Sequence, residues 1–150
     1  MNGDIANIFD FASVVESFDI ISMNPGNVSV FGSMNIDYSI RTKRLPQAGG
    51  TIIGGPIHVF SGGKSGNQAV AASLIGGHVK MFGCIGNDAN GDFLLRKLSK
   101  AGINISGIKR TDKPSGSTLI TVDDAGENTI VYSPGANSLL STTYVQSIYS

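Results

Sequence analysis

The sequence predicts an α/β protein, with a doubly wound sheet and a small, separate group of short β-strands. Apolar strand patterns alternate with amphipathic helix patterns between residues 65 and 102, as they do in doubly wound sheets. The chain has 20 glycines in 150 residues, many of them in pairs that indicate tight turns between short elements. Between residues 38 and 60, Gly and Pro rather than helices separate the apolar runs, which predicts the group of short strands.

Composition limits the classes of protein and of partner. A hydrophobic content of 41% with 15% charged residues is typical of one globular domain. Eleven basic residues balance eleven acidic residues, so no field of one sign favours nucleic acid or a membrane surface as a partner. Cys84 is the only cysteine, which excludes an internal disulfide and suits a reducing compartment. Because no apolar run reaches the roughly 18 residues of a membrane helix, we expect a cytoplasmic protein.

The first element expected is an amphipathic helix over residues 4–18, where apolar residues recur at helical spacing. A Pro-Gly-Asn turn then interrupts the chain, and a short β-rich run over residues 28–31 ends in glycine. We therefore expect an N-terminal extension over residues 1–26 and a domain over residues 27–150.

The next elements are short strands and one helix. Strands are expected at residues 38–41, 51–53 and 57–60, in one antiparallel patch. An alanine-rich helix follows from Ser65 and ends at the glycine pair 76–77.

A buried strand is expected at residues 78–86, followed by an amphipathic helix over residues 90–102. We expect Asn90 to be the N-cap of this helix and Gly102 to end it. The helix is expected to face the core with Phe93, Leu94 and Leu98.

The last part of the chain predicts a hairpin and a helix. Two β-rich runs, residues 117–123 and 128–133, flank a turn at residues 124–128. A final helix, capped by Ser141, is expected to continue to Tyr149.

Two polar side chains follow the first predicted strand, in the segment GSMNID. Asn35 and Asp37 are two residues apart, so in an extended chain they point to the same side. They lie near the carboxyl end of a strand, where open α/β sheets bind ligands. A carboxylate acceptor beside an amide that donates and accepts suits the neighbouring hydroxyls of a sugar. An Asx turn at the end of the strand is the alternative, and spacing alone favours it.

The loop FSGGKSGN, which precedes the alanine-rich helix, contains a second group of polar atoms. It is not a phosphate-binding P-loop, because the first glycine of G-x-x-x-x-G-K-[ST] would fall at His58. Gly62 and Gly63 allow a ligand to approach the backbone closely, and Lys64 adds a positive charge. Asn67 lies in the first helical turn, whose free N–H groups attract oxygen atoms. A glycine turn with a solvated lysine is the alternative.

The remaining candidates have weaker patterns. His58 and His78 have no acidic partner at a telling spacing, so we assign them no role. Asp88 and Asp92 could bind a cation, but their loop lacks the spacing and the closing Glu of an EF-hand, and capping is favoured. Cys84 is expected to pack in the core.

Five segments occur in a telling order: GSMNID, LPQAGGTIIG, SGGKSGNQAVAASLIGG, GCIGNDANGD and PGANSLLS. On these segments, residues 27–150 resemble the N-terminal half of the ribokinase or PfkB family of carbohydrate kinases, most closely its ribokinases. The resemblance implies a ribokinase-like doubly wound sheet with a small β-strand lid at about residues 38–60. In ribokinase-like members the lid closes over the sugar and also forms a homodimer contact.

The resemblance also implies roles for single residues. Asn35 and Asp37 match the family's ligands of the sugar hydroxyls. Gly63, Lys64 and Asn67 match the family's glycine-rich substrate loop. No other position of this sequence is assigned a substrate contact by the resemblance.

The family transfers a phosphoryl group from ATP with Mg²⁺ to a sugar hydroxyl, and a monovalent cation is a further cofactor that the resemblance allows. Its catalytic base is the Asp of a G-A-G-D motif at a helix N-terminus, and its nucleotide-binding segments follow that motif. The motif is absent from this sequence. We therefore expect a chain truncated before the catalytic motif, which carries the sugar-binding half of a kinase for ribose or a related sugar and is inactive alone.

A protein of another class fits the same residues. It is a non-catalytic truncated protein or pseudoenzyme, which binds sugar or dimerises through the lid. Exposed strand edges favour such association.

Overall fold

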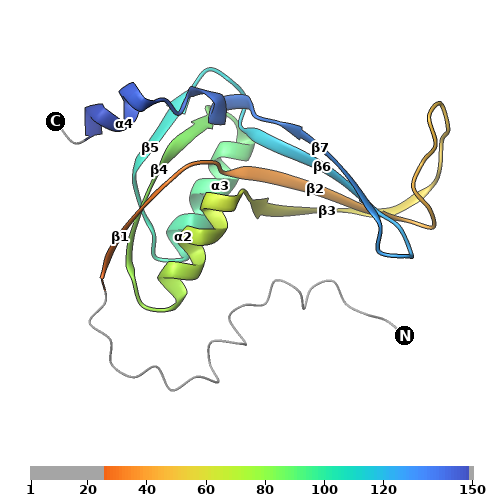
Figure 1. Ribbon diagram of the computed structural model, residues 1–150, viewed down its shortest axis with the longest axis horizontal. Coiled ribbons are helices and arrows are strands. Elements are labelled where there is room, and N and C mark those ends of the chain that lie inside the picture. Colours follow the sequence, from red (N-terminus) through yellow and green to blue (C-terminus); the bar gives the residue numbers. More distant parts are fainter. Residues whose placement is uncertain (1–25, 149–150) are drawn as a thin grey trace.

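The computed structural model describes residues 26–148, which form two β-sheets with helices against the first (Figure 1). The first sheet is parallel, with strand order β1-β4-β5. The second is mixed, with strand order β3-β2-β6-β7. The predicted α/β fold with a separate small sheet is confirmed. The helix predicted over residues 4–18 lies outside the described residues.

The elements have the following bounds. The strands are β1 (Asn27–Phe31), β2 (Asn35–Thr42), β3 (Gly54–Gly62), β4 (His78–Gly86), β5 (Asn104–Thr111), β6 (Gly116–Val122) and β7 (Asn128–Ser133). The helices are α2 (Lys64–Leu74), α3 (Ala89–Lys100), the 3₁₀-helix η2 (Gly135–Leu139) and α4 (Thr142–Ile148).

The core lies between the parallel sheet and the two longer helices. α2 contacts β1 and β4, and α3 contacts β4 and β5. Alternation along each strand brings apolar side chains to the helix-covered face. The buried residues of this core are Val30, Met34, Ile36, Ala69, Val79, Met81, Ile85, Leu94, Leu98 and Ile103. On the opposite face, Phe31 stacks on Phe82 with ring centroids 4.5 Å apart.

The helix and strand that follow the glycine-rich loop have nearly the predicted bounds. α2 begins one residue earlier than expected, at Lys64, and β4 covers the expected residues 78–86. Gly76 has a φ of +91°, which an L-residue with a side chain rarely adopts. Its N–H donates to the carbonyl of Ser73 at 3.0 Å, so the chain leaves the helix there, as predicted.

The predicted cap of α3 was wrong. Asp88 is the N-cap, and its Oδ1 accepts from the N–H of Gly91 at 2.7 Å. A cap must reach the N–H of the second or third helical residue, and Asn90 lies inside the first turn. The Asn90 Oδ1 instead accepts from the hydroxyl of Tyr38 at 3.0 Å. The capping role favoured for Asp88 over a cation is therefore confirmed.

The second sheet, called the lid sheet here, comprises β3, β2, β6 and β7 and projects away from the helices (Figure 1). β2 pairs antiparallel with β3 and parallel with β6, and β6 pairs antiparallel with β7. The predicted hairpin of β6 and β7 is confirmed. β2 and β3 contain the strands predicted at residues 38–41 and 57–60, and their antiparallel pairing is confirmed. The sheet as a whole is mixed, because β6 lies parallel to β2.

The strand predicted at residues 51–53 was also wrong. The pairing of β2 with β3 ends at Thr42 and Gly54, and the hydroxyl of Thr42 donates to the carbonyl of Arg44 at 2.8 Å as the chain turns. Residues 51–53 therefore have no neighbouring strand, and the side chain of Ile53 is 95% exposed.

Asp88 also fixes the start of β6. Its Oδ2 accepts from the N–H of Ser115 at 2.8 Å, and its Oδ1 accepts from the hydroxyl of Ser115 at 2.7 Å. The same hydroxyl accepts from the N–H of Gly86 at 2.9 Å. One carboxylate thus joins the end of β4, the first turn of α3 and the root of the lid sheet.

We predict that Asp88→Ala lowers the free energy of unfolding by about 2 kcal/mol at pH 7, because a cap and two further bonds to a charged group are lost. Burial alone would raise the pKa of Asp88, but the hydrogen bonds from Ser115 and Gly91, with the charge of Arg110, lower it. A lowered carboxyl pKa contributes stability above the unfolded value of 3.8, and this contribution is lost as the pH falls through the folded pKa.

The difference between wild type and Asp88→Ala should therefore shrink below about pH 3.8. Urea unfolding at pH 7 and pH 3, followed by circular dichroism, measures it. Asp124→Ala, in the exposed turn of the β6–β7 hairpin, is the control. Equal losses in the two variants would contradict the anchoring role of Asp88.

Candidate functional site

A row of polar and aromatic side chains crosses all four strands of the lid sheet. The strand registers place Phe60, Asp37, Thr118 and Tyr132 side by side. Because directly paired residues point to the same face of a sheet, the carboxylate lies between an aromatic ring and two hydroxyl-bearing side chains. Such a face offers hydrogen-bonding groups and ring surfaces to a ligand rich in hydroxyls.

Asp37 lies against the glycine-rich loop. A Cβ added at Gly62 would overlap the Asp37 carboxylate, so only glycine leaves room for the carboxylate in this position. Partial burial raises the pKa of Asp37, and a hydrogen bond from Thr118 partly opposes this effect. The carboxylate is therefore held in a place where its charged form is incompletely solvated.

Gly63 packs on the connection between β1 and β2. It has a φ of +93°, and a Cβ at this position would lie 2.6 Å from the carbonyl oxygen of Ser33 and 3.0 Å from the nitrogen of Asn35. The same carbonyl accepts from the N–H of Gly66 at 3.2 Å. The loop and the start of α2 are thus fixed directly beside the start of β2.

The structure brings three of the five predicted site residues together. Asn35, Asp37 and Gly63 lie at the junction of β2 with the glycine-rich loop, and neither polar residue is in an Asx turn. Lys64 and Asn67 lie in the first turn of α2 and are exposed. Their side chains form no hydrogen bond or ion pair within residues 26–148, so their contact with a ligand stays a prediction.

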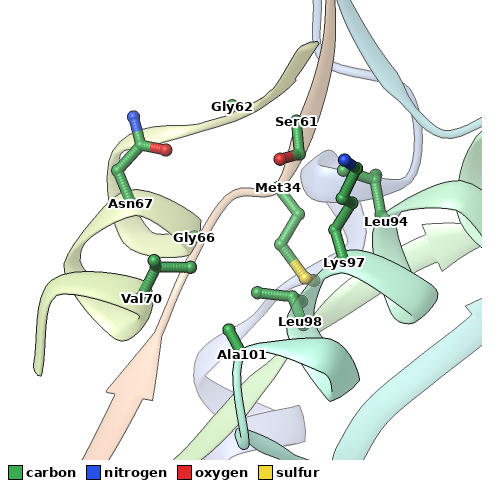
Figure 2. A pocket seen from close by; sticks show the side chains of 10 residues that line it. All are labelled: Met34, Ser61, Gly62, Gly66, Asn67, Val70, Leu94, Lys97, Leu98 and Ala101. Carbon is green, nitrogen blue, oxygen red and sulfur yellow. The ribbon is translucent and has the colours of Figure 1, made fainter. Parts of the chain in front are cut away.

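Asn67 borders a hollow of about 180 Å³ between α2 and α3 (Figure 2). Met34 lies at its centre, and Val70 and Leu98 approach from the two helices. Ser61 also lines the hollow, and it points to the face of the lid sheet opposite to Asp37, because strand residues alternate. The Ser61 side of the hollow therefore lies on the other face of β3 from Asp37, and Gly62, which is in contact with Asp37, borders both.

Sequence reasoning missed three residues near Asp37. Thr118 and Tyr132 reach the row through the parallel pairing of β2 with β6, which no local pattern predicts. Asn137 donates from Nδ2 to the Oδ1 of Asn35 at 2.8 Å. The segment PGANSLLS contains Asn137 and was recognised as a motif, but a side chain 102 residues away from Asn35 could not be assigned a contact.

Residues 26–148 contain no group of three or more His, Cys, Asp or Glu side chains that could hold a metal ion. In the same part of the chain, no helix is long and apolar enough to cross a membrane.

Comparison with known proteins identifies the family. A model described as pfkB family carbohydrate kinase matches residues 26–149. The chain belongs to this family. A ribokinase of Schizosaccharomyces pombe is 40% identical to this chain over 129 residues. The match covers 81% of this chain and 41% of the relative. The chain spans 36–41% of the length of five curated ribokinases that it matches.

Solved structures agree with this assignment. A ribokinase of Giardia lamblia matches this chain with a TM-score of 0.75 at 32% identity. The match covers 83% of this chain and 38% of the ribokinase. A ribokinase of Arabidopsis thaliana complexed with ribose and ATP matches with a TM-score of 0.67 at 28% identity, over 77% of this chain and 38% of the other. The ribokinase-like fold and the resemblance to the family are confirmed.

We predict that Gly63→Ala lowers the free energy of unfolding by about 3 kcal/mol, because it adds a steric clash with Ser33 to the strain of a positive φ. Gly49→Ala is the matched control, since Gly49 has a φ of +75° but nothing within 4 Å of an added Cβ. That control should lose only about 1 kcal/mol. Denaturant unfolding measures both, and equal losses would show that the contact of Gly63 adds nothing.

We predict that Asp37→Asn raises the melting temperature at pH 7. The folded pKa of Asp37 lies above its ordinary value of 3.8, so the wild type loses stability as the pH rises from 3.8 through the folded pKa. The amide carries no charge and avoids this loss. Calorimetric melting at pH 7 and pH 3 should show a higher melting temperature for Asp37→Asn than for wild type only at pH 7. A lower melting temperature of Asp37→Asn at pH 7 would refute this prediction. Asp124→Asn is the exposed control.

Proposed function

We propose that this pfkB-family chain supplies the sugar-binding half of a ribokinase-type kinase whose substrate is ribose or a related sugar. The observation that carries the proposal is the Asp37 carboxylate, which lies on the glycine-rich loop within a row of hydroxyl and aromatic side chains. The names of the relatives support the choice of ribose. One of the matching structures is described as a complex with ribose and ATP.

Each proposed ligand has a distinct chemical role. Asp37 accepts a hydrogen bond from a sugar hydroxyl, and Asn35 binds a neighbouring hydroxyl. Gly63 lets the sugar approach the backbone, while Lys64 and Asn67 form the second wall from the first turn of α2. Lys64 and Asn67 are exposed, and in this proposal they reach the sugar when the lid sheet closes. Closure also excludes water, which would compete with the sugar for the phosphoryl group.

ATP with Mg²⁺ supplies the phosphoryl group when it is bound, and a monovalent cation is compatible with the same chemistry. In this proposal the catalytic base and the nucleotide site come from residues outside this chain, because the G-A-G-D motif is absent from the sequence. The role of this chain is then to bind and orient the sugar hydroxyl, which is a large part of catalysis in phosphoryl transfer. The 150-residue chain alone should transfer no phosphoryl group.

A second function is favoured by the other face of the lid sheet. Val59, Tyr38, Leu119 and Val131 form a row on that face. Tyr38 is half-buried, and the side chains of Val59, Leu119 and Val131 are 45%, 59% and 66% exposed. Exposed apolar side chains that gather on one face are typical of association surfaces. A non-catalytic protein that dimerises through the lid sheet would use this row and would not need a sugar.

One experiment separates the two functions. Titration calorimetry of the 150-residue chain with ribose should show binding, and Asp37→Ala should weaken it at least about tenfold, because a hydrogen bond to a charged group is lost. Asp124→Ala is the control. The mass in solution should be measured on the same samples.

Dimerisation without ribose binding would favour the second function and reject the first. Phosphorylation of ribose by the isolated chain in the presence of ATP and Mg²⁺ would also contradict the proposal that the catalytic base and the nucleotide site come from residues outside this chain.

A further inference from the structure

Asn137, in η2, is bound to the chain segment where β2 begins. Its Oδ1 accepts from the N–H of Met34 at 3.0 Å, and its Nδ2 donates to the carbonyl of Met34 at 3.1 Å. The side chain thus pairs with one backbone residue as a neighbouring strand would. The same Nδ2 donates to the Oδ1 of Asn35 at 2.8 Å and lies 3.4 Å from the hydroxyl of Tyr132.

This arrangement fixes which way two carboxamides point. The oxygen and nitrogen of an amide are usually assigned from the hydrogen bonds around them. Here the backbone decides, because an N–H can only donate and a carbonyl can only accept. Met34 therefore fixes the orientation of Asn137. The Nδ2 of Asn137 lies 2.8 Å from the carboxamide of Asn35, and two NH₂ groups would repel each other at this distance. The Oδ1 of Asn35 must therefore face Asn137, and the Nδ2 of Asn35 must face away.

Gly116 leaves the space that this pair occupies. A Cβ at Gly116 would overlap the Nδ2 of Asn137 and would lie 2.6 Å from the Oδ1 of Asn35. Gly116 is buried and does not have a positive φ, so its backbone would accept another residue. The contact with the two carboxamides is what excludes a side chain at this position.

We propose that Asn137 is a positioning residue that holds the Asn35 carboxamide with its NH₂ group toward the ligand, on the face of β2 shared with Asp37. This inference rests on the proposed sugar site. It gives that site a defined polarity, with a donor at Asn35 beside an acceptor at Asp37. Such a pair recognises two neighbouring hydroxyls, one accepting from Asn35 and the other donating to Asp37. Without Asn137, Asn35 can rotate and present a second acceptor.

The first test needs no sugar. In the ¹⁵N-labelled 150-residue chain, the side-chain NH₂ signals of Asn35 are assigned by their loss in Asn35→Ala. Their order parameter should fall in Asn137→Ala and in Gly116→Ala. Ser138→Ala is the matched control in η2, because it removes the bonds of this hydroxyl to the carbonyl of Gly135 and from Lys113 without touching Asn35. An unchanged order parameter in both test variants would overturn the proposal.

Asn137→Asp is the second variant, for use if Asn137→Ala does not fold. The new carboxylate still accepts from the N–H of Met34, but it can donate neither to the carbonyl of Met34 nor to Asn35. The carboxamide of Asn35 should then turn its NH₂ group toward the carboxylate, and its two amide proton shifts should move. If the shifts of Asn35 stay those of the wild type, the inferred orientation is wrong.

The second test measures ribose affinity in a double-mutant cycle. Asn137→Ala should weaken ribose binding about tenfold, because the hydrogen bond that Asn35 donates to the sugar is lost. In the Asn35→Ala background, Asn137→Ala should cause no further loss of affinity. The same loss in both backgrounds would show a merely structural role and would overturn the proposal. If the wild type binds no ribose, the proposed function fails, while the order parameter of Asn35 still decides the positioning role.

Discussion

The structure depends on a contact that only glycine permits. Gly63 packs its backbone directly on the connection between β1 and β2, at a φ of +93°, and Gly62 leaves room for the Asp37 carboxylate. Through this contact the end of β3, the start of β2 and the first turn of α2 meet at one point. A side chain at either glycine would move the lid sheet relative to the helix-covered sheet. The site residues would then no longer share one junction.

Two carboxylates differ in how far the folded protein satisfies them with hydrogen bonds. Asp88 accepts three hydrogen bonds from Ser115 and Gly91, so its charge contributes to holding α3 and β6 together. Asp37 is partly desolvated and has only Thr118 as an opposing influence on its pKa. A ligand hydroxyl would supply the bond that the folded protein does not. A partly desolvated carboxylate with few hydrogen bonds is typical of a binding site whose geometry is maintained at some cost in stability.

Local patterns predicted most of the elements, and long-range pairing explains what they missed. The bounds of α2 and β4 follow from alanine content, apolar runs and glycine pairs close in sequence. The cap of α3 was missed because Asp88 and Asn90 are both good capping residues. The partners that hold their side chains, Ser115 for Asp88 and Tyr38 for Asn90, lie far away in the sequence. The contacts that Thr118 and Asn137 make near the site come from segments about 80 and 100 residues away. No spacing rule reaches so far.

The parallel pairing of β2 with β6 also has a consequence for synthesis on the ribosome. Asn35 pairs with Gly116, so one edge of β2 has no partner until about 80 further residues have been added. At about 5–20 residues per second, this interval lasts roughly 4–16 s. β3 can pair with the other edge at once, which leaves a nascent hairpin with an open edge of the kind that recruits other chains. Expression rate and chaperone supply should therefore influence the soluble yield of this protein.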